Sequence, residues 1–347
     1  MCAPDIPPLS FQESRRLFIK AMLMAGSWPI LGRIRFPGNR GSNGGRGDPS
    51  DIVFKYRTIS VDHFPELQED VDKLRRGGRL SRNPTFRGYI DKLRFQLPEN
   101  FKRAKSLIIL ATLTPSMEAD FHYRGKVHRI TIPPQYYDDG ITLADLIRIV
   151  RTNIVKDPGA QIEYAKGIHL KLSAVRSGLG RYGRNNLCFV DGFGTFLTLY
   201  AFLTDRVFAE DHWGPLGMLE ACRECSICYG ICPTNAIVRE NFVIDAGKCI
   251  SLYNEIDGEF PPWILPGMHN SLMGCMKCQS GCPENEKVAQ PAGRLEDVTE
   301  VETAAILDGK SDEELLASLK RKLRGFSGSS SPEAFPIFTR NLNVLIR

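Results

Sequence analysis

Eight of the ten cysteines in this chain of 347 residues lie between Cys222 and Cys282. In a small secreted protein so many cysteines would indicate disulfides, but this chain is long and its cysteines are crowded into one segment. Thiolates at short, regular spacings are typical ligands of a metal centre. We therefore expect this segment to fold around metal.

Two runs of cysteines each end in a Cys-Pro pair. The first has the spacing C-x2-C-x2-C-x3-C-P and consists of Cys222, Cys225, Cys228, Cys232 and Pro233. Bacterial ferredoxins with two [4Fe-4S] clusters use this spacing, and their fourth cysteine binds the other cluster. The second run has the same ending but lacks one early thiol, and consists of Cys275, Cys278, Cys282 and Pro283. Cys249 is the obvious supplier of the missing ligand.

Exchange of one cysteine between the runs fills two clusters. The first cluster takes Cys222, Cys225, Cys228 and Cys282, and the second takes Cys249, Cys275, Cys278 and Cys232. A pair of zinc sites is the main alternative, but zinc does not need a third cysteine followed by x3-Cys-Pro. A disulfide network would make the repeated proline-ended run a coincidence. The spacing therefore favours two [4Fe-4S] clusters.

Composition excludes some classes of protein. Hydrophobic residues make up 42% and charged residues 24%, as in ordinary soluble proteins. The longest apolar runs, residues 21–32 and 107–113, are shorter than the ~20 residues that cross a bilayer, so we expect no integral membrane span. The net charge of +5 permits contact with nucleic acid but does not indicate it.

Residues 1–50 differ in composition from the rest of the chain. They are basic, rich in glycine towards their end, and are expected to form a flexible extension. Residues 14–20, SRRLFIK, resemble a twin-arginine export signal, although no A-x-A cleavage site follows. Two locations stay open: the cytoplasm, with a basic N-terminal helix, or export by the twin-arginine route.

The pattern beyond residue 50 mixes helices and strands, which predicts an α+β fold. An α/β cofactor-binding domain is expected at 51–210, a ferredoxin-like dicluster domain at 211–290, and a tail with one helix, residues 312–324, at 291–347. Apolar periodicity predicts helices at 64–76, 84–97 and 143–155. A continuous apolar run predicts a buried strand at 106–113. Hairpins are predicted at 121–132 and at 186–204.

One glycine-rich loop stands before the second hairpin. It reads AVRSGLGRYGRNN and contains Gly178, Gly180 and Gly183, with arginines between them. Glycines let backbone amides approach a ligand closely, yet the same residues also form ordinary turns with positive φ. The loop alone does not decide between these two roles.

In the order of five motifs the chain resembles the epoxyqueuosine reductases and, more distantly, the corrinoid reductive dehalogenases. These motifs are AVRSGLGRYGRNN, GTFLTLYAFLTD, CxxCxxCxxxCP, KCIS and CxxCxxxCP. The resemblance covers residues 172–285. It implies a nitroreductase-like α/β domain that holds cobalamin, beside a ferredoxin-like module that feeds it electrons singly. Carried over by position, it implies a cofactor-binding set of Gly178, Gly180, Gly183, Arg184, Asn185 and Ser251.

The chain departs from this family in two places. The family's proton-donating aspartate corresponds by position to Tyr164, which is therefore the candidate catalytic acid, with His169 as a second candidate and a packed core tyrosine as the alternative. We also expect the chain to lack the C-terminal helical repeats that help many epoxyqueuosine reductases grip tRNA. Both departures make tRNA doubtful as a substrate and leave a small molecule or a nucleoside. Asp120 and His122 match the cobalt-binding pattern D-x-H-x-x-G, which we take as coincidence.

Three functions remain in view. The first is a reductase that passes electrons from a ferredoxin or flavodoxin through two [4Fe-4S] clusters to a corrinoid and an organic substrate. The second is a non-catalytic electron carrier that docks a partner oxidoreductase without cobalamin. The third makes the clusters sensory or structural. A first domain much larger than a carrier needs favours the reductase.

Overall fold

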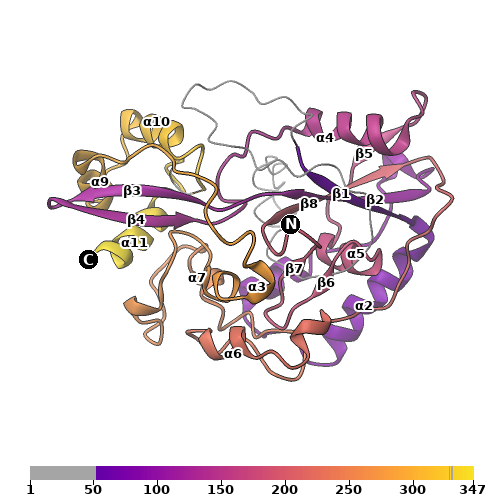
Figure 1. The fold of residues 1–347 in the computed structure, drawn as a ribbon, viewed down its shortest axis with the longest axis horizontal. Helices are drawn as coiled ribbons and strands as arrows, with labels where there is room; N and C mark the ends of the chain where they lie inside the picture. Colours follow the sequence, from indigo (N-terminus) through magenta and orange to yellow (C-terminus); the bar gives the residue numbers. More distant parts are fainter. Residues whose placement is uncertain (1–51, 328, 330) are drawn as a thin grey trace, which may run out of the picture.

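The computed structural model describes residues 52–347 apart from positions 328 and 330. The predicted N-terminal extension, with its twin-arginine segment, lies outside these residues. Figure 1 shows a central sheet flanked by helices, a long hairpin at one end of the molecule, and a loop-rich segment that carries the cysteines. The mixed α+β class is therefore confirmed.

The central sheet has four antiparallel strands in the order β1-β2-β8-β5. Their bounds are Phe54–Ser60, Ser106–Leu113, Leu197–Thr204 and Ile162–Tyr164 respectively. The predicted apolar strand is β2, and all of its residues but the last are buried between β1 and β8. Continuous apolar character is needed here because both faces of the strand are covered.

The two faces of the sheet contact different cores. On β8, Leu199 and Ala201 pack into a large core with α2 (Phe64–Arg76) and α5 (Leu170–Arg176). Tyr200 and Phe202 point to the opposite face, where they meet α4 (Leu143–Ile149) and the π-helical turn Val150–Val155 that continues it. The predicted helix at 143–155 is thus confirmed, with its last turns widened.

Helix α3 (Pro84–Ile90) begins where its cap predicts. The Asn83 side chain accepts a hydrogen bond from the Phe86 amide, and proline occupies the first turn. It ends at Ile90, seven residues before the predicted end, and an irregular segment with the 3-10 turn Glu99–Phe101 follows. In the stretch 92–96 exposed residues alternate with the buried Leu93 and Phe95, a period of two that does not fit a helix, and proline follows at position 98.

The first predicted hairpin is confirmed as β3 (Met117–Tyr123) and β4 (Lys126–Ile132). Arg124 and Gly125 form its turn, both with positive φ. The hairpin packs against three C-terminal helices in a separate core that includes Phe121 and Phe338. These helices are α9 (Glu300–Leu307), α10 (Glu313–Lys322) and α11 (Phe335–Ile346). The predicted tail with one helix is therefore wrong: it holds three, which pack as part of the fold.

The second predicted hairpin is also wrong. β7 (Cys188–Phe189) pairs with β6 (Arg181–Tyr182), whereas β8 pairs with β2 and β5. Only an isolated bridge between Val190 and Gly194 joins the two sides of the intervening turn. The turn therefore redirects the chain from a small two-stranded sheet into the main sheet.

The cysteine segment is built from short elements. They are α6 (Ile227–Ile231), α7 (Ile250–Tyr253), α8 (Lys277–Ser280) and the 3-10 turns Glu220–Cys222, Pro266–Met268 and Pro283–Asn285. Helices α6 and α8, one from each cysteine run, lie in contact. Across the part of the chain that the structure describes, no helix has the length and apolarity to cross a membrane.

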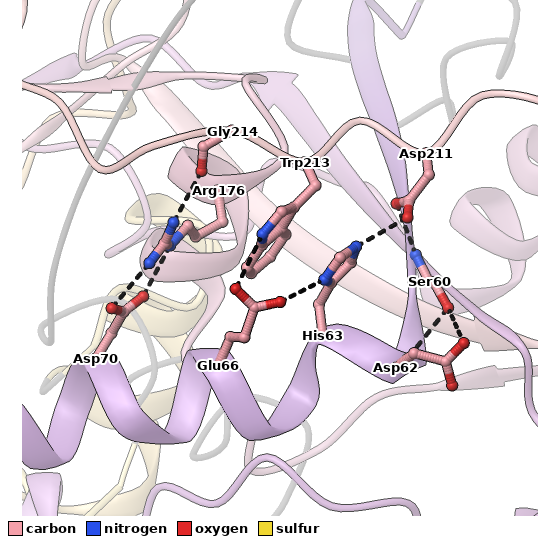
Figure 2. A network of polar contacts seen from close by, with 9 residues as sticks. All are labelled: Ser60, Asp62, His63, Glu66, Asp70, Arg176, Asp211, Trp213 and Gly214. Carbon is pink, nitrogen blue, oxygen red and sulfur yellow. Dashed lines mark hydrogen bonds and ion pairs between the residues drawn. The ribbon is translucent and has the colours of Figure 1, made fainter.

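A polar network fastens the chain after β8 onto α2 (Figure 2). Arg176 binds Asp70 through two hydrogen bonds of 2.7 and 2.9 Å and lies 4.9 Å from the Trp213 ring centre. The His63 ring stacks on the same indole ring. Its Nδ1 forms a hydrogen bond with Glu66 and its Nε2 forms one with Asp211, at 2.8 Å each. The network therefore fixes the point where the chain leaves the sheet for the cysteine segment.

Candidate iron–sulfur and cofactor site

The structure gathers the first set of cysteines that the spacing predicts. The pKa of the free Cys282 thiol is raised to about 11, first by burial and then by the nearby Cys222, Cys228 and Cys225. Burial likewise raises the pKa of Cys228 to about 11, with contributions from Cys222 and Cys225. Cys282 from the second run thus lies beside three cysteines of the first.

The second set is gathered in the same way. Burial raises the pKa of Cys275 to about 11, and the charges of Cys249 and Cys232 act in the same direction. The pKa of Cys278 is raised well above its usual value by burial, then by Cys275 and Cys249. The charges of Cys228 and Cys232 also raise the pKa of Cys278. Since Cys228 belongs to the first set, the two sets lie next to each other.

All nine described cysteines are free thiols, which removes the disulfide alternative for them. Within the described residues, no three histidine, cysteine or acidic side chains are gathered closely enough to hold a single metal ion. A single tetrahedral zinc ion needs its sulfur ligands at about 2.3 Å. Eight thiols in two adjoining sets match in number the ligands that two [4Fe-4S] clusters need.

Two sulfurs of the second set accept hydrogen bonds. The Ala236 amide donates to the Cys232 sulfur at 3.3 Å, and the Asn270 side-chain amide donates to the Cys275 sulfur at 3.2 Å. Donors of this kind stabilise the more negative, reduced cluster and so raise its potential. Asn270 would therefore raise the potential of a cluster bound by Cys275.

Arg184 and Asn185 hold the two cysteine loops. The buried Arg184 guanidinium donates to the carbonyl oxygens of Cys222, Arg223 and Cys225, at 2.8 Å for Cys225. Its neighbour Asn185 donates to the Cys278 carbonyl at 3.2 Å. Arg184 is not among the residues that line the cavity described below, and its guanidinium binds backbone carbonyls of the first cysteine loop, so its place beside a corrinoid stays a prediction.

The three loop glycines serve the backbone and do not line a cavity. Gly178 follows α5 with φ of +67°, and its amide donates to the Val175 carbonyl, while Gly180 donates to Ala174. These bonds end the helix, and left-handed glycine is the usual residue at this position. Gly183 accepts from Asn186 in the next turn. The expectation that Gly178, Gly180 and Gly183 contact a cofactor is therefore corrected to the turn-forming alternative.

A cavity lies between the sheet and the second set of cysteines. Its empty space, including the part open to solvent, is about 1430 Å³. Leu197 and Leu199 of β8 line one side, and Asn185 and Ser251 also reach it. The opposite wall is lined by three cysteines of the second set, Cys249, Cys275 and Cys278. A group bound here would therefore lie directly against the second cluster.

Two ionisable side chains in this wall were missed by sequence reasoning. Lys171 on α5 is 7% exposed, and burial lowers its pKa to about 7. The Tyr136 hydroxyl donates to Glu255, and burial raises its pKa, with further effects of Cys249 and Cys275. Only the apolar setting of Lys171, between leucines in a helix, gave a hint in the sequence.

The candidate acids named from the sequence do not line the cavity. Tyr164 lies on β5 and packs edge-on against Phe202, on the opposite face of the sheet. The expectation that Tyr164 is the catalytic acid is therefore wrong, and it is a packed core tyrosine. His169 accepts from the Leu172 amide as the cap of α5, and burial lowers its pKa to about 3. A ring that stays neutral and capped is poorly placed to donate a proton.

The D-x-H-x-x-G match is a coincidence, as expected. Asp120 is buried and binds Arg129 and Arg294, and His122 pairs with Asp297 at 3.0 Å. Both residues lie on strand β3 of the hairpin, which packs against the C-terminal helices. Their partners are carboxylates and guanidinium groups of that region.

Comparison with known proteins agrees with this geometry. Residues 221–285 match the family model of a 4Fe-4S double cluster binding domain. Epoxyqueuosine reductase of Staphylococcus aureus is 36% identical over 115 residues, which cover 33% of this chain and 29% of the relative. That of Atelocyanobacterium thalassa is 28% identical over 211 residues, which cover 57% of this chain and 64% of the relative. The chain thus spans less than two thirds of either relative.

Solved structures show the same fold. The epoxyqueuosine reductase of Streptococcus thermophilus matches with a TM-score of 0.61 and 18% identity, over 84% of this chain and 76% of that one. An epoxyqueuosine reductase solved with an epoxyqueuosine-modified tRNA stem loop matches with a TM-score of 0.57 and 20% identity, over 84% and 76%. Identities this low establish likeness of fold only. The chain is therefore similar to epoxyqueuosine reductases in part of its sequence and in its fold, and its residues 221–285 match a 4Fe-4S double cluster binding domain.

Proposed function

We propose that the protein is an iron–sulfur reductase in which two [4Fe-4S] clusters deliver electrons to a corrinoid in the cavity and from there to an organic substrate. The observation that carries this proposal is the position of Cys249, Cys275 and Cys278 in the cavity wall. A cluster that forms one wall of a cavity needs an acceptor in that cavity if its electrons are to be used. A plain electron carrier has no need of such a space.

The residues of the wall suit a large, mostly apolar cofactor with polar edges. Leucine, isoleucine, proline and aromatic side chains supply much of the lining, while the Asn185 amide and the Ser251 hydroxyl supply hydrogen-bonding groups. A bound corrinoid would supply a strongly reducing cobalt centre. Asn185 would position it and the second cysteine loop together, because the amide group already binds the Cys278 carbonyl.

Protons for the reduction would come from the same wall. Apart from cysteines, the ionisable side chains that line the cavity are Lys171, Tyr136, Glu255 and Tyr89. A nucleoside or another small organic molecule fits the relatives' activity, and the epoxyqueuosine-modified stem loop bound by one structural neighbour makes that RNA the first substrate to assay. A ferredoxin or flavodoxin is the proposed electron donor.

Anaerobic reconstitution tests the proposal. Protein supplied with iron, sulfide and hydroxocobalamin should hold about eight irons and one corrinoid after gel filtration. Replacement of Asn185 by alanine should weaken corrinoid retention, and replacement of Cys228 by alanine should reduce the iron content. Full iron with no bound corrinoid, at protein concentrations well above micromolar, would favour the electron-carrier alternative. The absence of the family aspartate is the sequence feature that supports this alternative.

The cellular location of the protein depends on whether residues 1–50 act as an export signal. We propose the cytoplasm, where the nucleoside substrates of such enzymes occur, with twin-arginine export as the alternative. Fractionation of cells that express the full chain, with and without Arg15 and Arg16 replaced by lysine, decides between them. Appearance outside the cytoplasm that depends on the arginine pair would establish export.

A further inference from the structure

Lys171 is a buried cation in the wall of the cavity. Residues 170–175 of α5 are all buried. Leu170 and Lys171 line the cavity, and Lys171 is the one of the two that carries an amino group. Among the residues that the structure describes, its ammonium group has no hydrogen bond or ion pair. Buried lysines normally have such a partner, because a charge removed from water is costly.

The other charged groups of the wall do not neutralise it. Glu255 accepts the Tyr136 hydroxyl and is not among the groups that act on Lys171. The charges of Cys188 and Cys249 act on Lys171 and favour its ammonium form. No carboxylate is among the groups that act on it.

A ligand anion would supply that partner. The rest of the wall is largely apolar and includes Phe86, Leu187 and Leu252, so an anionic group could reach Lys171 only as part of a molecule with an apolar body. In such surroundings a charge-assisted contact is stronger than in water.

We propose that Lys171 is the anion-binding residue of this cavity and that it holds a carboxylate or phosphate group of a ligand with an apolar body. This inference rests on the proposed function, since the anion belongs either to the corrinoid, through the phosphodiester of its nucleotide tail, or to the organic substrate. In both cases Lys171 fixes the orientation of the ligand relative to Cys249 and its cluster.

Two matched pairs of probes test the inference on cluster-loaded protein. Cobalamin and cobinamide differ in the phosphate-bearing tail, and 2-naphthoate and 2-naphthalenemethanol differ in the carboxylate. Anaerobic titrations should give at least tenfold tighter binding to the wild type for the member of one pair that carries the phosphate or carboxylate group. Lys171→Met should abolish that preference and leave the affinity for the member without this group unchanged, whereas Lys171→Arg should retain the preference. Lys166→Met, at an exposed lysine before α5, is the matched control.

The outcomes separate the sources of the anion. A Lys171-dependent preference for cobalamin assigns the site to the cofactor, and a Lys171-dependent preference for 2-naphthoate assigns it to the substrate. A wild type without any preference, or a preference that survives Lys171→Met, overturns the inference. Iron content is measured on every variant, and Lys171→Gln replaces the methionine variant should that one lose its clusters. Failure of the proposed function is distinct, because it would appear as missing iron or as no binding of either corrinoid.

Discussion

Asn285 and Thr195 clamp the end of the second cysteine run to the turn before β8. The Asn285 side-chain amide donates to the Thr195 hydroxyl at 2.8 Å, and its oxygen accepts from the Thr195 backbone amide at 2.9 Å. Asn285 is fully buried. The cysteine segment is therefore attached to the sheet by a specific pair of hydrogen bonds as well as by apolar packing.

The clamp depends on a glycine next to it. A Cβ atom on Gly194 would collide with the Asn285 side-chain oxygen, and Gly194 has φ of +52°. We expect Gly194→Ala to disrupt the clamp and impose left-handed strain of about 1–2 kcal/mol. Each lost hydrogen bond adds about 1 kcal/mol.

Gly125→Ala is the matched control for this substitution. Its φ is +69°, but nothing lies within 4 Å of its Cβ position, so it carries the strain alone. Anaerobic thermal unfolding should show a fall in Tm of a few degrees for Gly125→Ala and at least twice that for Gly194→Ala. Equal shifts would show that the Asn285 contact contributes nothing to stability.

Arg184→Met should selectively destabilise the first cluster. The variant loses the hydrogen bonds to the carbonyls of the first cysteine loop, while the second loop keeps its contact with Asn185. Iron content should fall from about eight towards about four per chain. Arg223→Ala removes an exposed arginine that pairs with Glu220, and should keep full iron. A Met variant with full iron and an unchanged spectrum would contradict the assignment.

Asn270→Ala should lower the reduction potential of one cluster. The substitution removes the side-chain donor to the Cys275 sulfur. Because this donor stabilises the reduced state, we expect a shift on the order of tens of millivolts to more negative values. Redox titration followed by electron paramagnetic resonance measures both potentials, and the other cluster is the internal control. A positive shift, or movement of both potentials alike, would contradict the prediction.

His63 should make stability depend on pH. Burial alone would lower the pKa of His63, but its hydrogen bonds and charge interactions with Glu66 and Asp211 prevail and raise it above 6.5. The stabilisation is complete below the unfolded-state pKa and is lost as pH rises through the higher folded-state value.

His63→Gln should therefore lower Tm more at pH 6 than at pH 9 (Figure 2). His128→Gln, on hairpin strand β4 outside this network, is the control and should show no such difference. Thermal unfolding of both variants and the wild type in matched buffers supplies the measurement. A loss that is equal at the two pH values, or greater at pH 9, would mean that the imidazolium form is not the one that binds the two carboxylates.

The cysteine sets could be predicted because their spacing alone fixes the ligands. Three thiols two residues apart leave little freedom, and the proline-ended fourth thiol points away from them. Buried strand β2 and the cap of α3 were equally local signals. The three C-terminal helices were partly available too, since Thr299 and Glu302 form a capping box that marks the start of α9.

The cavity could not be read from the sequence in the same way. Tyr136, Lys171 and Ser251 come from separate segments, and only the packing of the cysteine module against the sheet brings them together. A count of positions back from the glycine loop selected Tyr164. Residues of a strand alternate between the two faces of its sheet, and Tyr164 lies on the face opposite to the cavity. The pairing of β8 with β2, more than eighty positions away, likewise has no local signal.

Arg184 and Asn185 are consecutive residues, and each binds a different cysteine loop. A single peptide unit therefore fixes both loops to one rigid turn. A substitution that displaces this turn is therefore expected to disturb both predicted cluster sites, whereas a change confined to one cysteine loop is expected to disturb only one.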